Sequence, residues 1–304
     1  MKGLFVNKST LFQFGVLFYF FLMGALLSML VGYTIGNLTG SDQEAPSDRH
    51  FFILQASQFF SATLMFIIPA ICTAYFCSME PSKFLHIKKI NVRIILLSAV
   101  MLILISPAID ITTYLNSKIH FPDFMAPVEA WMIKADAIAA EVTVRLLSEK
   151  GLLPLLINIL VICVMAGLAE ELIFRGALLS VIRKKIKNPH VAIWIVAIIF
   201  SVIHFQFSGF IPRILLGAFL GYLLYWTNSI WAPIFAHFLN NTIAIAGYKL
   251  GLYQLSSDSS ALISADTSTE HLYTTIILAI AGLALFALCA KKMKAIGLQS
   301  EENT

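Results

Sequence analysis

Residues 151–176 read GLLPLLINILVICVMAGLAEELIFRG. The first 19 positions carry no charge, which is about the length that an α-helix needs to cross a bilayer. Glu170, Glu171 and Arg175 follow within the same apolar region. An ionisable side chain near the middle of a bilayer costs roughly 2.5 to 3.5 kcal/mol, so these three side chains indicate a functional site inside a membrane protein.

The composition of the chain is that of an integral membrane protein. Of its 304 residues, 59% are hydrophobic and 12% are charged, whereas soluble proteins average roughly 45 to 50% and 25%. Such a chain is too apolar to be disordered, and its spans leave little sequence for a soluble domain. The net charge is +4, but the basic residues stand in short groups beside apolar runs. We interpret them as membrane topology signals and expect no nucleic-acid partner.

Charge-free runs predict an all-α polytopic membrane protein with about eight transmembrane helices. The predicted helices cover residues 11–36, 51–76, 94–116, 152–182, 190–207, 210–227, 230–249 and 271–290. Residues 117–150 mix apolar and charged side chains with a helical period, which predicts one amphipathic helix at the membrane interface. The polar loops 39–50 and 251–270 are expected to be solvated connections. Gly217 and Gly221 predict close packing between helices of this chain, with a dimer face as the alternative.

Lysine and arginine place both ends of the chain in the cytoplasm. An even number of spans puts the two ends on the same side of the membrane. On that side lie 13 of the 21 basic residues, against seven on the opposite side and Arg175 inside a helix. By the positive-inside rule, the side richer in lysine and arginine faces the cytoplasm.

The three charges in the fourth predicted helix differ in whether they can neutralise one another. Glu171 and Arg175 stand four residues apart, so they share a helix face and can form an ion pair that supports the structure. Glu170 is turned about 100° away, and no basic residue stands three or four positions from it. Glu170 therefore needs a partner on another helix.

Two histidines and an asparagine are further polar groups deep in apolar segments. His204 stands in the fifth predicted helix, and His237 and Asn241 stand four residues apart in the seventh. We expect them to meet Glu170 in a buried cluster, although each alone is also explained as a hydrogen bond between helices. Straight helices would leave the two imidazoles about 12 Å apart in depth. We therefore expect the fourth and fifth helices to extend beyond the cytoplasmic surface and the sixth to be short or tilted.

Asp110 stands near the end of the third predicted helix, three residues after Pro107. Its place close to the membrane interface favours a solvated carboxylate. A position facing a cavity is the alternative.

The polar cluster contains the groups needed for hydrolysis without a covalent intermediate. A carboxylate and an imidazole can deprotonate a water molecule that attacks a carbonyl group. The second imidazole and Asn241 would then stabilise the oxyanion. Zinc is an open alternative, with Glu170, His204 and His237 as ligands, because two histidines and a carboxylate form a recognised catalytic set. The sequence has no His-Glu-x-x-His pattern, so we expect no cofactor.

Three motifs carry a resemblance to a known family. They are Glu170-Glu171-Leu172-Ile173-Phe174-Arg175-Gly176, Phe200-Ser201-Val202-Ile203-His204 and His237-Phe238-Leu239-Asn240-Asn241. In this order they resemble the motifs of the CPBP family, the type II CAAX prenyl endopeptidases and bacteriocin-processing (Abi) membrane proteases. The resemblance implies an eight-helix intramembrane endopeptidase in which Glu170 and His204 activate water. It also implies that His237 and Asn241 stabilise the oxyanion and that Glu171 and Arg175 brace the site. It leaves the use of a metal open, because the family has been described both as metal-dependent and as a metal-independent glutamate type.

The resemblance divides the chain into three parts. Residues 1–150 form an N-terminal region of three membrane helices and the interfacial helix, and residues 151–250 form the catalytic core of four helices. Residues 251–304 form an extracytoplasmic loop, the last transmembrane helix and a cytoplasmic tail. The resemblance implies a peptide or lipidated protein as the substrate, in the lipid bilayer. Because the sequence shows no eukaryotic targeting signal, we expect the inner (plasma) membrane of a bacterium.

Two functions of other classes remain open. One is a non-catalytic scaffold with the same fold, for bacteriocin immunity or for binding a partner. The other is a proton-coupled carrier, because buried glutamate and histidine also build proton relays. No inverted repeat is detectable in the sequence, which disfavours the carrier.

Overall fold

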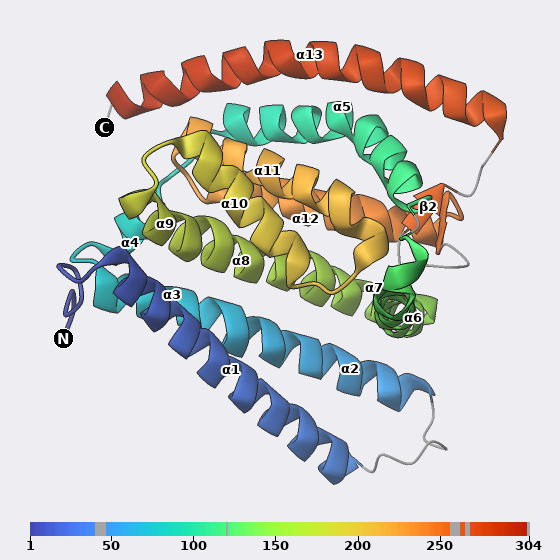
Figure 1. Ribbon diagram of the computed structural model, residues 1–304, viewed down its shortest axis with the longest axis horizontal. Coiled ribbons are helices and arrows are strands. Elements are labelled where there is room, and N and C mark those ends of the chain that lie inside the picture. Colours follow the sequence, from blue (N-terminus) through green and yellow to red (C-terminus); the bar gives the residue numbers. More distant parts are fainter. Residues whose placement is uncertain (40–46, 120, 256–261, 265–267, 303–304) are drawn as a thin grey trace.

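The structure is a computed structural model that describes residues 1–39, 47–119, 121–255, 262–264 and 268–302. It confirms an all-α polytopic membrane fold, in which long helices run side by side (Figure 1). Of the predicted loops, residues 40–46 of 39–50 and residues 256–261 and 265–267 of 251–270 lie outside the described residues, and residues 47–50 already belong to a helix.

The helices follow the charge-free runs of the sequence. Their bounds are α1 Thr10–Thr39, α2 Ser47–Ser61, α3 Ile68–Cys77, α4 Pro81–Phe84, α5 Val92–Asn116, α6 Ala126–Ser148, α7 Leu152–Asn158, α8 Ala166–Glu171, α9 Leu179–Lys185, α10 Pro189–Val202, α11 Phe210–Thr227, α12 Trp231–Lys249 and α13 Thr269–Glu302. Three π-helical segments join some of them into longer helices, namely η1 Ala62–Ile67, η3 Ile159–Met165 and η4 Leu172–Leu178. Two 3₁₀ turns, η2 Asp123–Met125 and η5 Phe207–Gly209, precede α6 and α11.

The part of the chain that the structure describes has a helix for each of the eight predicted ones. By length and composition, six helical stretches of the described residues can cross a membrane. Helix α10 is a shorter apolar helix, and α12 is not among the six. Helix α10 also ends at Val202, not at residue 207 as predicted. The count of eight spans therefore stays a prediction.

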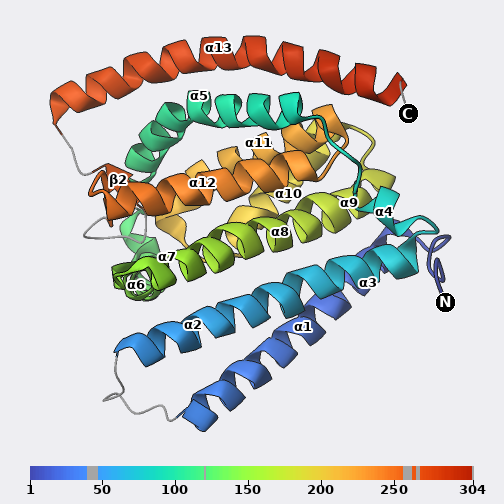
Figure 2. The ribbon, with the colours of Figure 1, turned by 180° about the vertical axis from the view of Figure 1, so that it is seen from behind.

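The helices form layers that place the three sequence motifs in the middle of the molecule. Helices α5 and α13 pack side by side along one face, and α1 packs against α2 and α3 along the other (Figures 1 and 2). Between these layers lie α7 to α12. The start of α1 and the end of α13 lie at the same end of the molecule, which agrees with an even number of spans.

Helix α6 runs across the other helices. It is seen nearly end-on in Figure 1, at the end of the molecule opposite the termini. A helix in this orientation is expected to lie along a membrane surface. Its buried Asp136 accepts hydrogen bonds from the backbone N–H groups of Phe207 and Ser208, both 3.0 Å away. These bonds tie α6 to the turn that precedes α11.

Two glycines bring α10 and α11 into close contact. A Cβ atom on Gly217 would lie 3.3 Å from Ala197, and one on Gly221 would lie 2.7 Å from a side-chain carbon of Ile193. Both contacts are within this chain, as predicted. Only a residue without a side chain allows the two backbones to approach this closely. This packing fixes α10, which leads into His204.

The loop predicted for 251–270 contains a short antiparallel hairpin. Its strands are β1 Tyr253–Leu255 and β2 Leu262–Ser264, and Tyr253 pairs with Ser264. The sequence did not predict these strands, because three residues each are too few to show an alternating pattern.

Candidate active site

The site is built on a fully buried ion pair between Glu171 and Arg175. The Nη1 atom of Arg175 lies 2.8 Å from Oε1 of Glu171, and both side chains have 0% exposure. The Nη2 atom donates to the backbone oxygen of Gly217 at 3.0 Å. The guanidinium carbon lies 4.5 Å from the centre of the Phe200 ring, a cation–π contact. The predicted pair is therefore present, and it links η4 to α10 and α11.

His237 binds the same carboxylate from helix α12. Its Nδ1 atom lies 2.8 Å from Oε1 of Glu171. Because a carboxylate only accepts hydrogen bonds, Nδ1 carries the proton, and the lone pair of the neutral ring is on Nε2. Glu171 thus holds the imidazole in one orientation and one tautomer.

His204 is oriented by the backbone and lies outside helix α10. Its Nδ1 atom donates to the carbonyl oxygen of Phe200 at 2.6 Å, so its Nε2 atom also carries the free lone pair. The prediction that His204 lies within a helix is wrong, because α10 ends two residues earlier. The next residue, Phe205, has a φ of 51°, a left-handed conformation that is strained for a bulky residue. This turn redirects the chain directly after the imidazole.

Glu170 faces both imidazoles at once. Its Oε2 atom lies 3.9 Å from Nε2 of His204 and 3.8 Å from Nε2 of His237. Three acceptor atoms that face one another favour a hydrogen-bond donor between them. A water molecule can lie at about 2.8 Å from the carboxylate and from either imidazole when these atoms are this far apart. The geometry is therefore that of a site that can hold and polarise water.

Exposure divides the cluster into two halves. The braced half consists of Glu171, Arg175 and His237, whose side chains are 0%, 0% and 6% exposed. The open half consists of Glu170 and His204, whose side chains are 18% and 26% exposed. The open half is therefore accessible from outside the molecule, whereas the braced half is buried.

Asn241 is not brought into contact with this cluster. Its Nδ2 atom donates to the backbone oxygen of Ile162 at 2.9 Å, and its Oδ1 atom accepts from Asn240 at 3.3 Å. A carboxamide has two N–H donors, so one remains for another acceptor. The structure thus assembles five of the six predicted site residues and leaves Asn241 beside them on α12.

One segment of the chain is similar to known proteins. Residues 152–243 match the family described as type II CAAX prenyl endopeptidase Rce1-like. The predicted resemblance is confirmed over this segment. A Bacillus subtilis protein described as uncharacterized protein YpbD is 27% identical over 90 residues, which are 28% of this chain and 43% of that protein. The chain thus spans less than half of the length of this relative. No solved structure matches.

The Rce1-like segment contains two contributors that sequence reasoning missed. Phe200 was quoted only as part of a motif, yet its ring touches Arg175 and lies 4.8 Å from the ring of His204. Its spacing four residues before His204 was the available signal. Arg213 was counted only among the seven basic residues opposite the cytoplasmic side, but it lies in the first turn of α11 and its charge interacts with that of Glu170. Its isolation within an apolar run was the available signal.

The zinc alternative would use the same side chains as ligands. A neutral imidazole whose Nδ1–H donates to a protein oxygen can bind zinc through Nε2. In the described ranges, however, no group of three or more His, Cys, Asp or Glu side chains is arranged to hold a metal ion. The zinc alternative with Glu170, His204 and His237 is therefore left to the chelator experiment described below.

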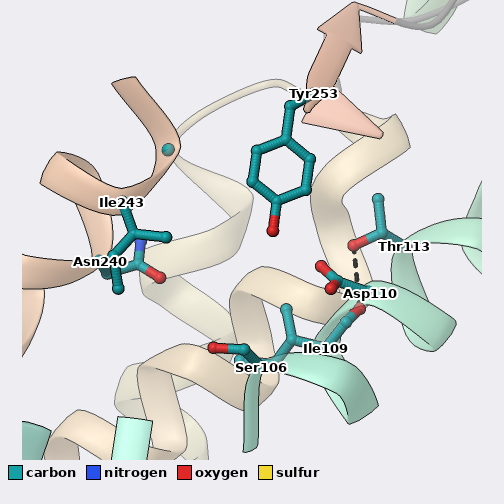
Figure 3. A pocket seen from close by; sticks show the side chains of 8 residues that line it. Ser106, Ile109, Asp110, Thr113, Asn240, Ile243 and Tyr253 are labelled. Atoms are coloured by element: carbon teal, nitrogen blue, oxygen red, sulfur yellow. Dashed lines mark hydrogen bonds between the residues drawn. The ribbon is translucent and has the colours of Figure 1, made fainter. Parts of the chain in front are cut away.

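Asp110 lines a cavity next to the Rce1-like segment. The cavity has a volume of about 130 Å³. Asp110 is exposed, as the solvated interpretation requires, and its carboxylate also faces this cavity with Asn240 and Tyr253 (Figure 3). Burial, together with the negative charge of Asp110, raises the pKa of the Tyr253 phenol, so Tyr253 stays a neutral donor. The cavity is reached from the β1 side of α12 and does not include the two imidazoles.

Proposed function

We propose that the protein is an intramembrane endopeptidase that hydrolyses a peptide bond with a water molecule activated by Glu170 and His204. The observation that carries the proposal is the position of one oxygen of Glu170 within 3.9 Å of two imidazole nitrogens. Both nitrogens have their lone pairs free, because the other ring nitrogen of each donates elsewhere. The confirmed resemblance to a prenyl endopeptidase family supports the same reaction.

The proposed reaction balances with these groups and water alone. Glu170, assisted by His204, takes a proton from water as its oxygen forms a bond to the carbonyl carbon of the substrate. The carbonyl oxygen becomes an oxyanion. When it collapses, the C–N bond breaks, and the proton held by Glu170 passes to the leaving nitrogen. The products are a carboxylic acid and an amine, and Glu170 returns to its ionised form.

His237 and Asn241 are proposed to stabilise the oxyanion. Each free donor aimed at such a charge is worth roughly 10²- to 10³-fold in rate. Asn241 has one N–H group left after its bond to Ile162, and it stands one helical turn beyond His237. His237 donates from Nε2 after it takes a proton from solvent when the substrate binds, and it returns this proton when the products leave; Glu171 at Nδ1 is the counter-ion of the charged ring. Glu171 and Arg175 brace the site, because they fix His237 without facing the substrate.

The substrate is proposed to be a membrane-associated or lipidated protein. The site lies among apolar helices, so a peptide anchored in the bilayer reaches it more readily than a soluble peptide does. The proposed location is the inner membrane of a bacterium, with both termini in the cytoplasm.

The test is a cleavage assay of the purified protein in detergent. Fluorogenic peptides, both bare and farnesylated, are incubated with wild type, Glu170→Gln and the matched control Glu141→Gln. Glu141 is an exposed glutamate on α6, so its loss leaves the site intact. We expect cleavage by wild type and by the control, and a loss of at least about 100-fold with Glu170→Gln.

A chelator arm of the same assay separates the two mechanisms. The proposed reaction predicts that the rate is unchanged by a chelator. Loss of the rate on chelation and its recovery with zinc would contradict the metal-free mechanism. Cleavage of none of the peptides by wild type would instead favour a non-catalytic scaffold or a carrier.

A further inference from the structure

Arg213 is a cation that follows the turn after His204. It lies in the first turn of α11 and is half-buried. Its Nη1 atom donates to the backbone oxygen of Gln206 at 3.0 Å, and its Nη2 atom donates to the side-chain oxygen of the same residue at 2.6 Å. A Cβ atom on Gly209 would lie 3.0 Å from Nη2, so the glycine leaves room for the guanidinium. The group is therefore held in one place and orientation.

The guanidinium acts electrostatically on the residues that are proposed to activate water. The charge of Arg213 interacts with that of Glu170, with that of His204 when this is protonated, and with that of Asp136. Yet no carboxylate of the described chain lies within the 4.0 Å of an ion pair with it. Arginine has five N–H donors, and its two bonds to Gln206 leave three. Arg213 is thus a fixed cation with three N–H donors left for a ligand.

A cation in this position needs a reason. It is half-buried within a helical stretch that is apolar enough to cross a membrane, and an ionisable residue in such a stretch is a candidate binding residue. The planar fork of a guanidinium matches a carboxylate, which it can bind through two parallel hydrogen bonds. An anion that approaches Glu170 would otherwise meet a negative charge. Arg213 offsets that repulsion next to the reacting atoms.

We propose that Arg213 binds a carboxylate of the substrate close to the scissile bond, and so selects peptides that carry one there. The inference rests on the proposed function, and it adds a specificity-determining residue to it. The carboxylate can be the free C-terminus of the peptide or an acidic side chain. Gln206 positions Arg213 for this role, and the turn between His204 and α11 places the bound carboxylate beside the activated water.

The test compares peptides that differ only in this charge. Each farnesylated peptide is made with a terminal acid or a terminal amide, and with Asp or Asn next to the cleaved bond. Wild type should prefer the charged member of one pair by roughly 10- to 100-fold in kcat/KM, through KM. Arg213→Gln should reduce that preference to about one, because the ratio between the two members of a pair cancels any change in rate that they share. The matched control Lys249→Gln, which removes an exposed cation at the end of α12, should keep the preference.

A purely structural role of Arg213 predicts a different result. If Arg213 only held the turn through Gln206, both members of each pair would lose the same factor, and the proposal would be wrong. An unchanged preference in Arg213→Gln would also overturn it. The pair that responds identifies the source of the carboxylate.

A binding measurement keeps this inference separate from the proposed activity. The same peptides are titrated by fluorescence anisotropy into Glu170→Gln protein, with and without the Arg213→Gln change. Tighter binding of the charged peptide that depends on Arg213 supports the inference, whether or not wild type cleaves any peptide. Absence of cleavage counts only against the proposed activity. Equal or absent binding of the two peptides contradicts the inference. Nanodiscs with phosphatidylglycerol instead of phosphatidylcholine provide the last arm, because loss of the preference there would assign Arg213 to an anionic lipid headgroup and contradict the inference.

Discussion

The braced and open halves of the polar cluster begin at adjacent residues, Glu171 and Glu170, but their environments are opposite. Glu171 is fully buried, and its Oε1 atom binds both Arg175 and His237 at 2.8 Å. Glu170 is 18% exposed and has only longer contacts, of 3.8 and 3.9 Å, to two imidazoles. The helix turns by about 100° between the two residues, which is enough to separate a dry face from an accessible one.

The difference between the halves separates a structural role from the proposed chemical one. A buried charge is tolerated only when it is paired and hydrogen-bonded, so the braced half is a structural unit. A group that reacts must keep some of its bonding capacity free, so the open half is where chemistry is possible. The predictions below test this division, from the largest effect to the smallest.

The largest effect is expected on activity, from the open half. Replacing His204 with Gln should reduce the rate of peptide cleavage by roughly 10²- to 10⁴-fold, because the lone pair on Nε2 that assists Glu170 is lost. Thermal stability should change little, because the side chain is only partly buried. The control His190→Gln alters an exposed histidine at the start of α10, the helix that precedes His204, and should keep full activity. Equal losses in the two variants would refute the role of His204.

A large loss of stability is expected from the braced half. Arg175→Met should cost about 3 to 5 kcal/mol, because it leaves Glu171 charged and buried without its cation. The double change Glu171→Gln with Arg175→Met should cost less than the single one, since no unpaired charge remains. Unfolding followed by intrinsic fluorescence in detergent measures both. A double variant less stable than Arg175→Met would contradict the brace.

A smaller effect on activity is expected at the edge of the cluster. Asn241→Ala should lower kcat by roughly 10²-fold if its free N–H group stabilises the oxyanion. Thr242→Val on the same helix is the matched control, because the Thr242 hydroxyl donates to the backbone oxygen of Phe238 one turn earlier. A similar loss in both variants would indicate that the two side chains only support α12. In that case Asn241 has no part in the reaction.

The smallest effect concerns a histidine far from the site. Burial lowers the pKa of His86, in the loop before α5, against the opposing effect of its 2.7 Å hydrogen bond to Asn228. The neutral ring is therefore favoured in the folded state, and the unfolded state binds more protons below about pH 6.5. Its contribution to stability is complete above that pH and is lost as the pH falls below it. His86→Asn should flatten this acid slope in a urea titration, whereas His190→Gln should not.

The sequence predicted the helices and the pairing within one helix, because both depend on local spacing. The apolar run from residue 151 to 176 predicted the fourth helix, and the four-residue spacing predicted the ion pair between Glu171 and Arg175. The need of Glu170 for a partner elsewhere followed from its lack of a nearby cation. The two histidines that face it satisfy that expectation.

The sequence did not predict the depth of the histidines. Straight helices separated the imidazoles by about 12 Å, yet both nitrogens lie within 3.9 Å of one oxygen. The error lies in His204, which is on a turn after a helix that ends early, with Phe205 in a left-handed conformation. Apolar periodicity does not reveal such a turn, because the residues on both sides of it are equally apolar. The same turn hid Arg213, whose position depends on it.

The most direct test of the division between the halves is to measure two properties of two variants side by side. Glu170→Gln and Glu171→Gln are purified together, and each is tested for cleavage of the farnesylated peptides and for thermal unfolding. We predict that Glu170→Gln loses at least about 100-fold in rate with its midpoint of unfolding retained. Glu171→Gln should have a markedly lower midpoint, because Arg175 is left buried without its anion. Full activity of Glu170→Gln, or a Glu171→Gln protein as stable as wild type, would contradict the account.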